Sequence, residues 1–193
     1  MKQRDAALQA FYDLTETAVL RRADSCKKAG PAARRVFDAL RNNVGGESNS
    51  AAERLSVCDA LESALQIAST GPAPIPALAA ALNGLSPRLQ WKRRKGSTPD
   101  GTNFYDSHAN ALVAGPGGLE EREDVWVGIS LLAPHVRYPD HRHPPEEVYV
   151  SLAGGAWWNE NMEWTTPGPG GLIYNEPSVL HAMRTEADRK SVV

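Results

Sequence analysis

The sequence is poor in cysteine, in excess basic charge and in long apolar runs, and each shortage excludes a class of protein. Only two cysteines occur among 193 residues, so neither a disulfide framework nor a cysteine-based metal site is expected. The formal net charge of -2 argues against a nucleic-acid-binding protein, which usually carries a basic domain or stripe. No apolar run reaches the roughly 18 residues of a transmembrane helix, and the first residues lack the apolar core of a signal peptide. We therefore expect a cytoplasmic protein that does not enter the membrane.

The first part of the chain, residues 1–86, has the apolar spacing of amphipathic helices. The periodic positions of its first two helical segments are Leu8, Phe11, Tyr12 and Val19, then Ala33, Val36, Leu40 and Val44. Ser50-Ala-Ala-Glu53 has the pattern of a capping box and predicts another helix start, while Asn83-Gly84 is expected to end the last helix. Because this part contains no catalytic signature, we expect it to pack against the second part or to form a homodimer.

Residues 87–193 contain short runs of aromatic and β-branched residues between turns rich in glycine and proline. The runs are "LQWKRRK", "ANALVAG", "VWVGISLLA", "EEVYVSLAGGAWW" and "GLIYNEP". The only basic cluster, "KRRK" at residues 92–95, lies in the first run, and we interpret it as a solvated or substrate-side face. Several short strands at this spacing favour a β-barrel or sandwich. We therefore predict a mainly β protein with an N-terminal helical region.

A group of polar residues in the fourth run has the composition of a metal site. His141, His143, Glu147 and Tyr149 all have odd numbers, so on a strand their side chains share one face, although the prolines at 144 and 145 can interrupt strict alternation. A third imidazole, His181, can come from a later strand. Imidazoles and a carboxylate suit a divalent metal such as Fe(II), Zn(II), Mn(II) or Ni(II). The alternative is an ordinary surface His-x-His with a solvated glutamate, but the glycines that follow favour the metal site.

The spacing of these residues resembles a known family. The pattern His141-x-His143-x-x-x-Glu147-x-x-x-x-x-x-Gly154 resembles the first motif of the cupin superfamily. Gly171 and Pro177 fit the second motif, but its usual glycine is Val179 here, and its usual histidine appears one position early as His181. The phrases "YPDHRHPPEEVYVSLAGGAWW" and "NEPSVLHAMRT", together with the helical first part, resemble the cupin-type dimethylsulfoniopropionate lyases of marine bacteria.

This resemblance implies a C-terminal cupin barrel and a metal-dependent β-elimination that converts dimethylsulfoniopropionate, a small zwitterion, into dimethyl sulfide and acrylate. It implies one divalent metal ion held by His143, Glu147 and His181, with His141 at the site as a candidate fourth ligand. Two other cupin functions stay open: an Fe(II) oxygenase acting on a small molecule, and a small-molecule-binding protein without catalysis. His108 and His135 are not expected to touch the metal.

The resemblance also implicates two tyrosines, Tyr149 and Tyr138. Tyr149 is the candidate base: a phenol has a pKa of about 10, and a nearby metal ion and the sulfonium would favour the phenolate. The alternatives are a packing role for Tyr149 and an orienting, gating or packing role for Tyr138. Trp157, Tyr174 and Trp126 are candidates to contact the sulfonium through their aromatic faces, although a core position is the simpler interpretation for each ring.

Overall fold

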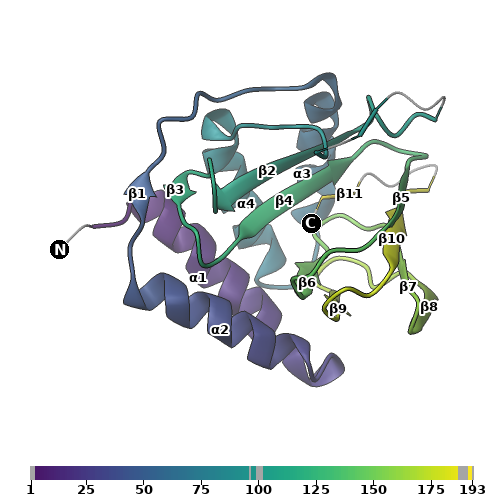
Figure 1. Ribbon diagram of the computed structural model, residues 1–193, viewed down its shortest axis with the longest axis horizontal. Helices are drawn as coiled ribbons and strands as arrows, with labels where there is room; N and C mark the ends of the chain where they lie inside the picture. The colour runs from purple at the N-terminus through teal and green to yellow at the C-terminus, as the bar shows by residue number, and fades with distance from the viewer. Residues whose placement is uncertain (1–2, 96, 99–101, 187–190, 193) are drawn as a thin grey trace.

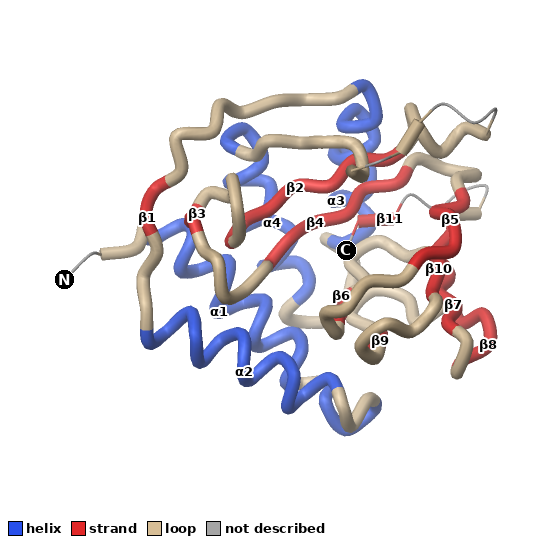
Figure 2. Tube along the Cα trace, in the orientation of Figure 1, coloured by secondary structure: helices blue, strands red, loops and turns tan. Residues whose placement is uncertain are grey.

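The computed structural model describes residues 3–95, 97–98, 102–186 and 191–192, with the α-helices in the first part of the chain and most strands in the second (Figures 1 and 2). Its α-helices are α1 (Ala6–Leu20), α2 (Ala29–Asn42), α3 (Leu61–Ala68) and α4 (Ile75–Leu85). Short 3-10 turns are η1 (Ala23–Ser25), η2 (Ser56–Ala60) and η3 (Ser86–Arg88). None of the helices within the described residues combines the length and the apolar character that crossing a membrane requires.

Local signals account for where the helices begin and which faces they bury. The carboxylate of Asp5 accepts a hydrogen bond of 3.0 Å from the Ala7 amide and caps the start of α1. Helix α4 carries Pro76 in its first turn, where the missing amide hydrogen costs nothing. Buried positions recur at helical spacing, with Leu8, Phe11, Tyr12 and Val19 in α1 and Leu78, Leu82 and Leu85 in α4. The predicted apolar periodicity of the first part is therefore confirmed.

The strands form three sheets. The first has the order β1-β3-β2-β4-β11, with the bounds Gly46–Glu47, Glu120–Glu121, His108–Ala114, Val127–Leu132 and Ser191–Val192. The second has the order β5-β10-β7-β8, with the bounds Arg137–His141, His181–Arg184, Ala156–Asn159 and Met162–Thr165. The third pairs β6 (Glu147–Val150) with β9 (Leu172–Asn175). Gly154 and Gly155 link β6 to β7 with φ angles of 129° and 112°, a region that favours glycine.

The helices pack on one face of the strand pair β2–β4. One buried cluster joins Leu82 of α4 with Ala109, Ala111 and Val113 of β2 and Leu131 of β4. Because side chains alternate along a strand, His108 and Asn110 face the other side, where both approach Tyr138 of the second sheet. A smaller buried cluster lies there, made of Phe104, Leu132, Val136, Tyr138, Trp157, Ile173 and Met183. In Figure 1, α3 and α4 lie behind β2 and β4, and α1 and α2 lie beside each other below them.

Three local predictions from the sequence are wrong. The expected capping box at residues 50–53 starts no helix. The backbone amide of Glu53 instead donates to the Leu89 carbonyl at 3.1 Å, and its carbonyl accepts from the Trp91 amide at 3.0 Å. Helix α4 runs through Gly84 to Leu85 instead of ending at the Asn-Gly pair. The run "LQWKRRK" forms only isolated bridges at Gln90 and Lys92 and no regular strand.

Candidate metal centre

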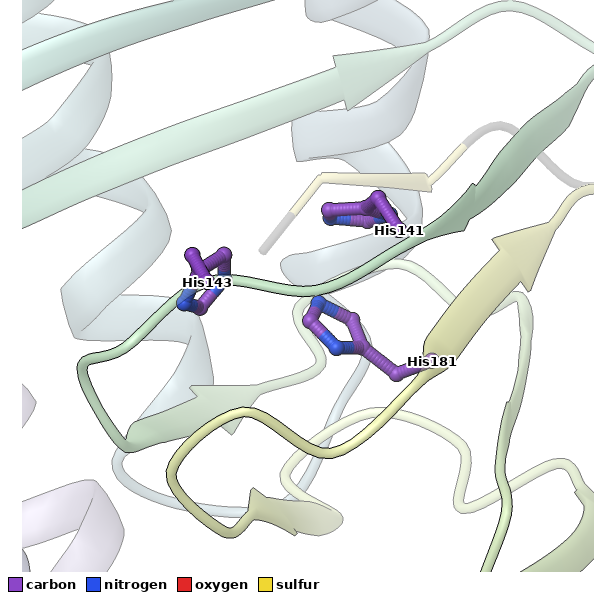
Figure 3. A group of neighbouring side chains, drawn as sticks. All are labelled: His141, His143 and His181. Atoms are coloured by element: carbon purple, nitrogen blue, oxygen red, sulfur yellow. The ribbon is translucent and has the colours of Figure 1, made fainter.

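Strand pairing brings three histidines together. His141 ends β5 and His181 begins β10, and the two are direct partners in the antiparallel register. His143 follows in the turn after β5. The ring centroid of His181 lies 4.1 Å from that of His141 and 5.1 Å from that of His143. Each ring offers one ligand nitrogen, and these three nitrogens lie within 4.8 Å of one another. Figure 3 shows the three rings turned toward a common space.

Backbone carbonyls fix the orientation of all three rings. Each Nδ1 lies within hydrogen-bond distance of the carbonyl two residues away, at 2.9 Å for His141, 3.0 Å for His143 and 3.0 Å for His181. An Nδ1–H that donates to a carbonyl leaves Nε2 as the ligand atom, which is the usual arrangement of metal-binding histidines. The Nε2 atom of His181 is buried and lies 3.3 Å from a carboxylate oxygen of Glu147. The three rings are therefore oriented as metal ligands before any metal binds.

Glu147, the first residue of β6, adds a carboxylate to the triad. Its Oε1 lies 3.0 Å from Nε2 of His143, and its Oε2 lies 3.3 Å from Nε2 of His181. A ring nitrogen and a carboxylate oxygen at these separations need a cation between them, either a proton or a metal ion. Burial alone would raise the pKa of Glu147, but the contacts with the two histidines outweigh it and hold that pKa well below its usual range. The donor set thus fits a divalent metal ion, and the geometry does not select among metals.

Burial and neighbouring charge also set the protonation of the histidines. Burial, helped by the nearby His181, lowers the pKa of His141 from 6.5 to about 4. His141 is therefore neutral near pH 7, as a ligand must be. The hydrogen bond to Glu147 raises the pKa of His143, so in the absence of a metal this ring and Glu147 form an ion pair.

Two asparagines that the sequence did not predict support Glu147, one from the third sheet and one from the second. Asn175 is the direct partner of Glu147 across β6–β9, and its Nδ2 lies 3.3 Å from Oε2 of Glu147. Asn159 in turn donates from its Nδ2 to Oδ1 of Asn175 at 3.0 Å. Both asparagines are buried. The only sequence signal is a polar residue at the end of each of two apolar strands, which names neither the partner nor the role.

Tyr149 lies against the same carboxylate. Its hydroxyl donates to Oε2 of Glu147 at 2.8 Å, and its side chain packs against the smaller buried cluster. Burial, then the negative charge of Glu147, raise the pKa of Tyr149 well above the usual value for a phenol. In this arrangement Tyr149 is therefore a protonated hydrogen-bond donor, whereas the sequence argument anticipated a phenolate.

Tyr138 lies on the other side of the histidines. Its ring centroid is 4.7 Å from that of His141 and 4.6 Å from that of Phe104. Asn110 donates from Nδ2 to its hydroxyl at 3.5 Å, and the guanidinium carbon of Arg94 lies 5.8 Å from its ring centroid. Burial raises the pKa of Tyr138, while Asn110 and Arg94 act in the opposite direction. Tyr138 is thus the tyrosine of the site that has a positive side chain beside it.

The three other aromatic candidates occupy different places. Trp157 is buried in the same cluster as Tyr138, and Tyr149 packs against that cluster. Tyr174 is the partner of Val148 on the face opposite Glu147, and its hydroxyl donates to Glu146 at 2.7 Å. The side chain of Trp126 is 66% exposed just before β4. The structure therefore brings Trp157 toward the site and does not bring Tyr174 or Trp126 there.

The remaining histidines stand apart from the triad, as expected. His108 is buried and stacks on Phe104 with ring centroids 3.8 Å apart. Its Nδ1 donates to the Phe104 carbonyl at 2.6 Å, and its Nε2 accepts from the Arg94 amide at 2.7 Å, so both ring nitrogens are engaged. His135 is exposed in the turn before β5, where its φ is 58°.

Comparison with known proteins finds one family model and several relatives that match this chain. A family model described as dimethylsulfoniopropionate lyase matches residues 29–192. The putative dimethylsulfoniopropionate lyase DddL of Cereibacter sphaeroides is 32% identical over 112 residues, which cover 58% of this chain and 46% of the relative. Dimethylsulfoniopropionate lyase DddQ of Ruegeria pomeroyi is 31% identical over 99 residues, which cover 50% of this chain and 48% of the relative. The matches thus span about half the length of these curated relatives.

The fold agrees as well. The crystal structure of the lyase DddQ from Ruegeria pomeroyi superposes with a TM-score of 0.67 at 23% sequence identity, covering 98% of this chain and 89% of the other. At this identity the likeness concerns the fold alone. It confirms the predicted fold class, a cupin-type arrangement of strands with N-terminal helices.

Proposed function

The chain belongs to the dimethylsulfoniopropionate lyase family, and from this we propose that it cleaves dimethylsulfoniopropionate into dimethyl sulfide and acrylate by a metal-dependent β-elimination. The observation that carries the proposal is the convergence of His141, His143 and His181 with Glu147 in one small volume. The difficult step of this reaction is removal of a proton from the α-carbon, which the neighbouring carboxylate barely acidifies. A site that can hold a metal ion suits the reaction, because the ion would withdraw charge from that carboxylate.

His143, Glu147 and His181 would hold the metal ion, and His141 is the candidate fourth ligand. The fixed Nδ1–H bonds of the rings support this assignment, and so do the short distances from Nε2 of His143 and of His181 to the Glu147 carboxylate. A divalent ion bound there would act as a Lewis acid toward the substrate carboxylate and stabilise the enolate-like charge of the transition state.

Tyr149 is the proposed base. It takes the proton from the α-carbon, the electron pair of that C–H bond forms the α,β double bond, and the β-carbon–sulfur bond breaks to release neutral dimethyl sulfide. Its hydroxyl, 2.8 Å from Glu147, lies beside the proposed ligands, which supports the role. The raised pKa of Tyr149 opposes it, so the positive charge of the bound substrate must favour the phenolate. Tyr138, in ring contact with His141, is proposed to orient the substrate.

Trp157 is the proposed contact for the sulfonium group. A soft cation gains about 0.5–2 kcal/mol against an aromatic face, depending on how far the site is desolvated. The burial of Trp157 together with Tyr138, with Tyr149 packed against the same cluster, supports this assignment. The positions of Tyr174 and Trp126 give no such support, and we propose no role for them in binding.

The decisive experiment pairs elemental analysis with a headspace assay. Purified protein is analysed for Fe, Zn, Mn and Ni, then loaded with each metal and mixed with dimethylsulfoniopropionate. We expect about one metal ion per chain and metal-dependent release of dimethyl sulfide with an equal amount of acrylate. Metal-loaded protein that binds the substrate without releasing dimethyl sulfide would instead support a binding protein, and oxygen consumption without release would support an oxygenase.

A further inference from the structure

The basic cluster at residues 92–95 places one arginine next to the candidate site. The guanidinium carbon of Arg94 lies 5.8 Å from the ring centroid of Tyr138. The centroid of the same tyrosine ring lies 4.7 Å from that of His141, one of the three clustered histidines. Arg94 and His141 are therefore both neighbours of the Tyr138 ring, and burial, helped by the charge of Arg94, lowers the pKa of His141.

The backbone that carries Arg94 is held firmly. Its amide donates to Nε2 of His108 at 2.7 Å, and His108 is buried and stacked on Phe104. Two residues earlier, Lys92 exchanges both backbone hydrogen bonds with Asn110 of β2, each at 2.8 Å. Arg94 thus starts from a fixed point on the first sheet, on the side that faces the candidate site.

Arg94 differs from its neighbour in having no anionic partner. Arg93 forms an ion pair with Asp106 at 2.9 Å and lies over the ring of Tyr105. For Arg94, in the part of the chain that the structure describes, the guanidinium contacts the Tyr138 ring and forms no ion pair with a carboxylate. Both arginines are partly buried. A partly buried guanidinium beside an aromatic ring, with its hydrogen-bond donors unpaired, is suited to take up an anion.

We propose that Arg94 binds the carboxylate of the substrate and sets the direction in which the substrate lies. The guanidinium donates charge-assisted hydrogen bonds to a carboxylate and leaves a carboxylate oxygen lone pair for the metal ion of the proposed function, and its charge disfavours the sulfonium end of the same molecule. The substrate is therefore held with its carboxylate toward Arg94 and Tyr138 and its sulfonium away from them. The identity of this zwitterion rests on the proposed function, but carboxylate binding by Arg94 does not.

The test separates the two ends of the substrate by using two unreactive probes, propionate and ethyldimethylsulfonium. Calorimetric titration into metal-loaded protein measures both. For R94Q we expect propionate to bind about 10- to 100-fold more weakly, the range for a lost charge-assisted hydrogen bond, and the sulfonium probe to bind equally well or more tightly. R94K keeps the positive charge but not the planar guanidinium, so it should lose less propionate affinity than R94Q. The matched control R93Q should bind both probes as the unmodified protein does.

Unchanged propionate affinity in R94Q and R94K would overturn the proposal, and so would a loss shared equally by both probes, which indicates a structural role. Metal content and circular dichroism of each variant identify misfolding, and if R94Q misfolds, R94K decides between the same outcomes. Failure of the lyase proposal looks different: the unmodified protein would release no dimethyl sulfide, while R94Q still lost propionate selectively.

Discussion

At the scale of single residues, Glu147 is the centre of the candidate site. Its two oxygens contact His143, His181, Tyr149 and Asn175. A partly buried carboxylate is costly unless its charge is balanced and its lone pairs are used, and here every contact meets one of these needs. The same contacts mean that a change at any one of these side chains alters the charge and position of Glu147.

Replacing Tyr149 by phenylalanine tests the base. The variant removes the hydroxyl and leaves the histidines in place, so we expect metal content to be retained and kcat to fall by about 10²–10⁴-fold, the usual contribution of a general base. The rate of dimethyl sulfide release, measured beside metal analysis, gives the answer. Y138F is the comparison, and we expect its KM to rise by a larger factor than its kcat falls. A larger fall in kcat for Y138F than for Y149F would make Tyr138 the base.

Replacing Asn175 by alanine tests the support of Glu147. The variant removes the Nδ2–H donor to Oε2 of Glu147, and loss of such an outer partner typically weakens metal binding by about 10- to 100-fold. Competition with a chelating dye measures the dissociation constant. The control is N161A, because Asn161 lies in the turn after β7 and contacts Glu176 rather than Glu147. Equal metal affinity in N175A and the unmodified protein would show that Asn175 does not position the ligand.

At the scale of elements, two strand pairings assemble the site and the helices brace it. The pairing β5–β10 joins His141 to His181, and the pairing β6–β9 joins Glu147 to Asn175. Helix α2 contacts both β6 and β9. A buried ion network lies at the other end of the helical layer, where Glu120 of β3 pairs with Arg4 and Arg122.

Buried and exposed ion pairs of this molecule should differ strongly in their effect on stability. The side chains of Arg4, Glu120 and Arg122 are only 6%, 3% and 2% exposed, and E120A leaves two buried guanidinium groups without this partner. We expect E120A to lower the free energy of unfolding by about 3–5 kcal/mol. R35A, which removes the ion pair between α2 and Glu146, should cost less than about 1 kcal/mol because Arg35 is largely exposed. Urea unfolding compares the two, and similar losses would contradict this ranking.

At the scale of the whole molecule, the helical and β parts share one large buried cluster, while a second cluster lies beside the histidines. The structure thus realises the expected packing of the first part against the second. The boundary between residues 86 and 87, the homodimer and the cytoplasmic location stay predictions. The charges of the candidate site contribute to acid stability together with the Glu120 ion network, whose carboxyl pKa is also lowered.

Acid should destabilise the metal-free protein through His141. Its pKa is lowered from 6.5 to about 4 in the folded state, so between these values the unfolded chain binds more protons. Stability therefore falls as the pH falls from 6.5 toward 4. His143, with a raised pKa, contributes stability below 6.5 that is lost only as the pH rises through its folded-state pKa. Glu147, whose pKa is lowered, loses its contribution only as the pH falls below its usual value of 4.5.

The measurement is the melting temperature of metal-free protein across this window. In H141Q the slope between pH 6.5 and 4 should be smaller than in the unmodified protein. The control H135Q changes an exposed histidine and should keep the slope. A slope in H141Q equal to that of the unmodified protein would assign the acid sensitivity to other groups.

The sequence by itself determined the features that depend on local order. Apolar spacing predicted α1 and α2, because residues three and four apart in the sequence lie on the same face of a helix. Motif spacing predicted that His141, His143, Glu147 and Tyr149 lie together, and these four do gather. The expectation that they share one strand is wrong except for Glu147 and Tyr149, because β5 ends at His141, His143 lies in the turn and β6 begins at Glu147. The local signal failed at Ser50–Glu53, where pairing with a distant segment took the backbone that a helix needed.

Only the tertiary structure decided the contacts between segments far apart in the chain. The register of β10 on β5 brings His181 to His141, and the register of β9 on β6 brings Asn175 to Glu147 and sends Tyr174 to the opposite face. The approach of Arg94 to Tyr138 also appears only in three dimensions. Strand register is set by the packing of the whole molecule, and a shift of one residue in β10 or β9 would turn His181, Asn175 and Tyr174 to the other face.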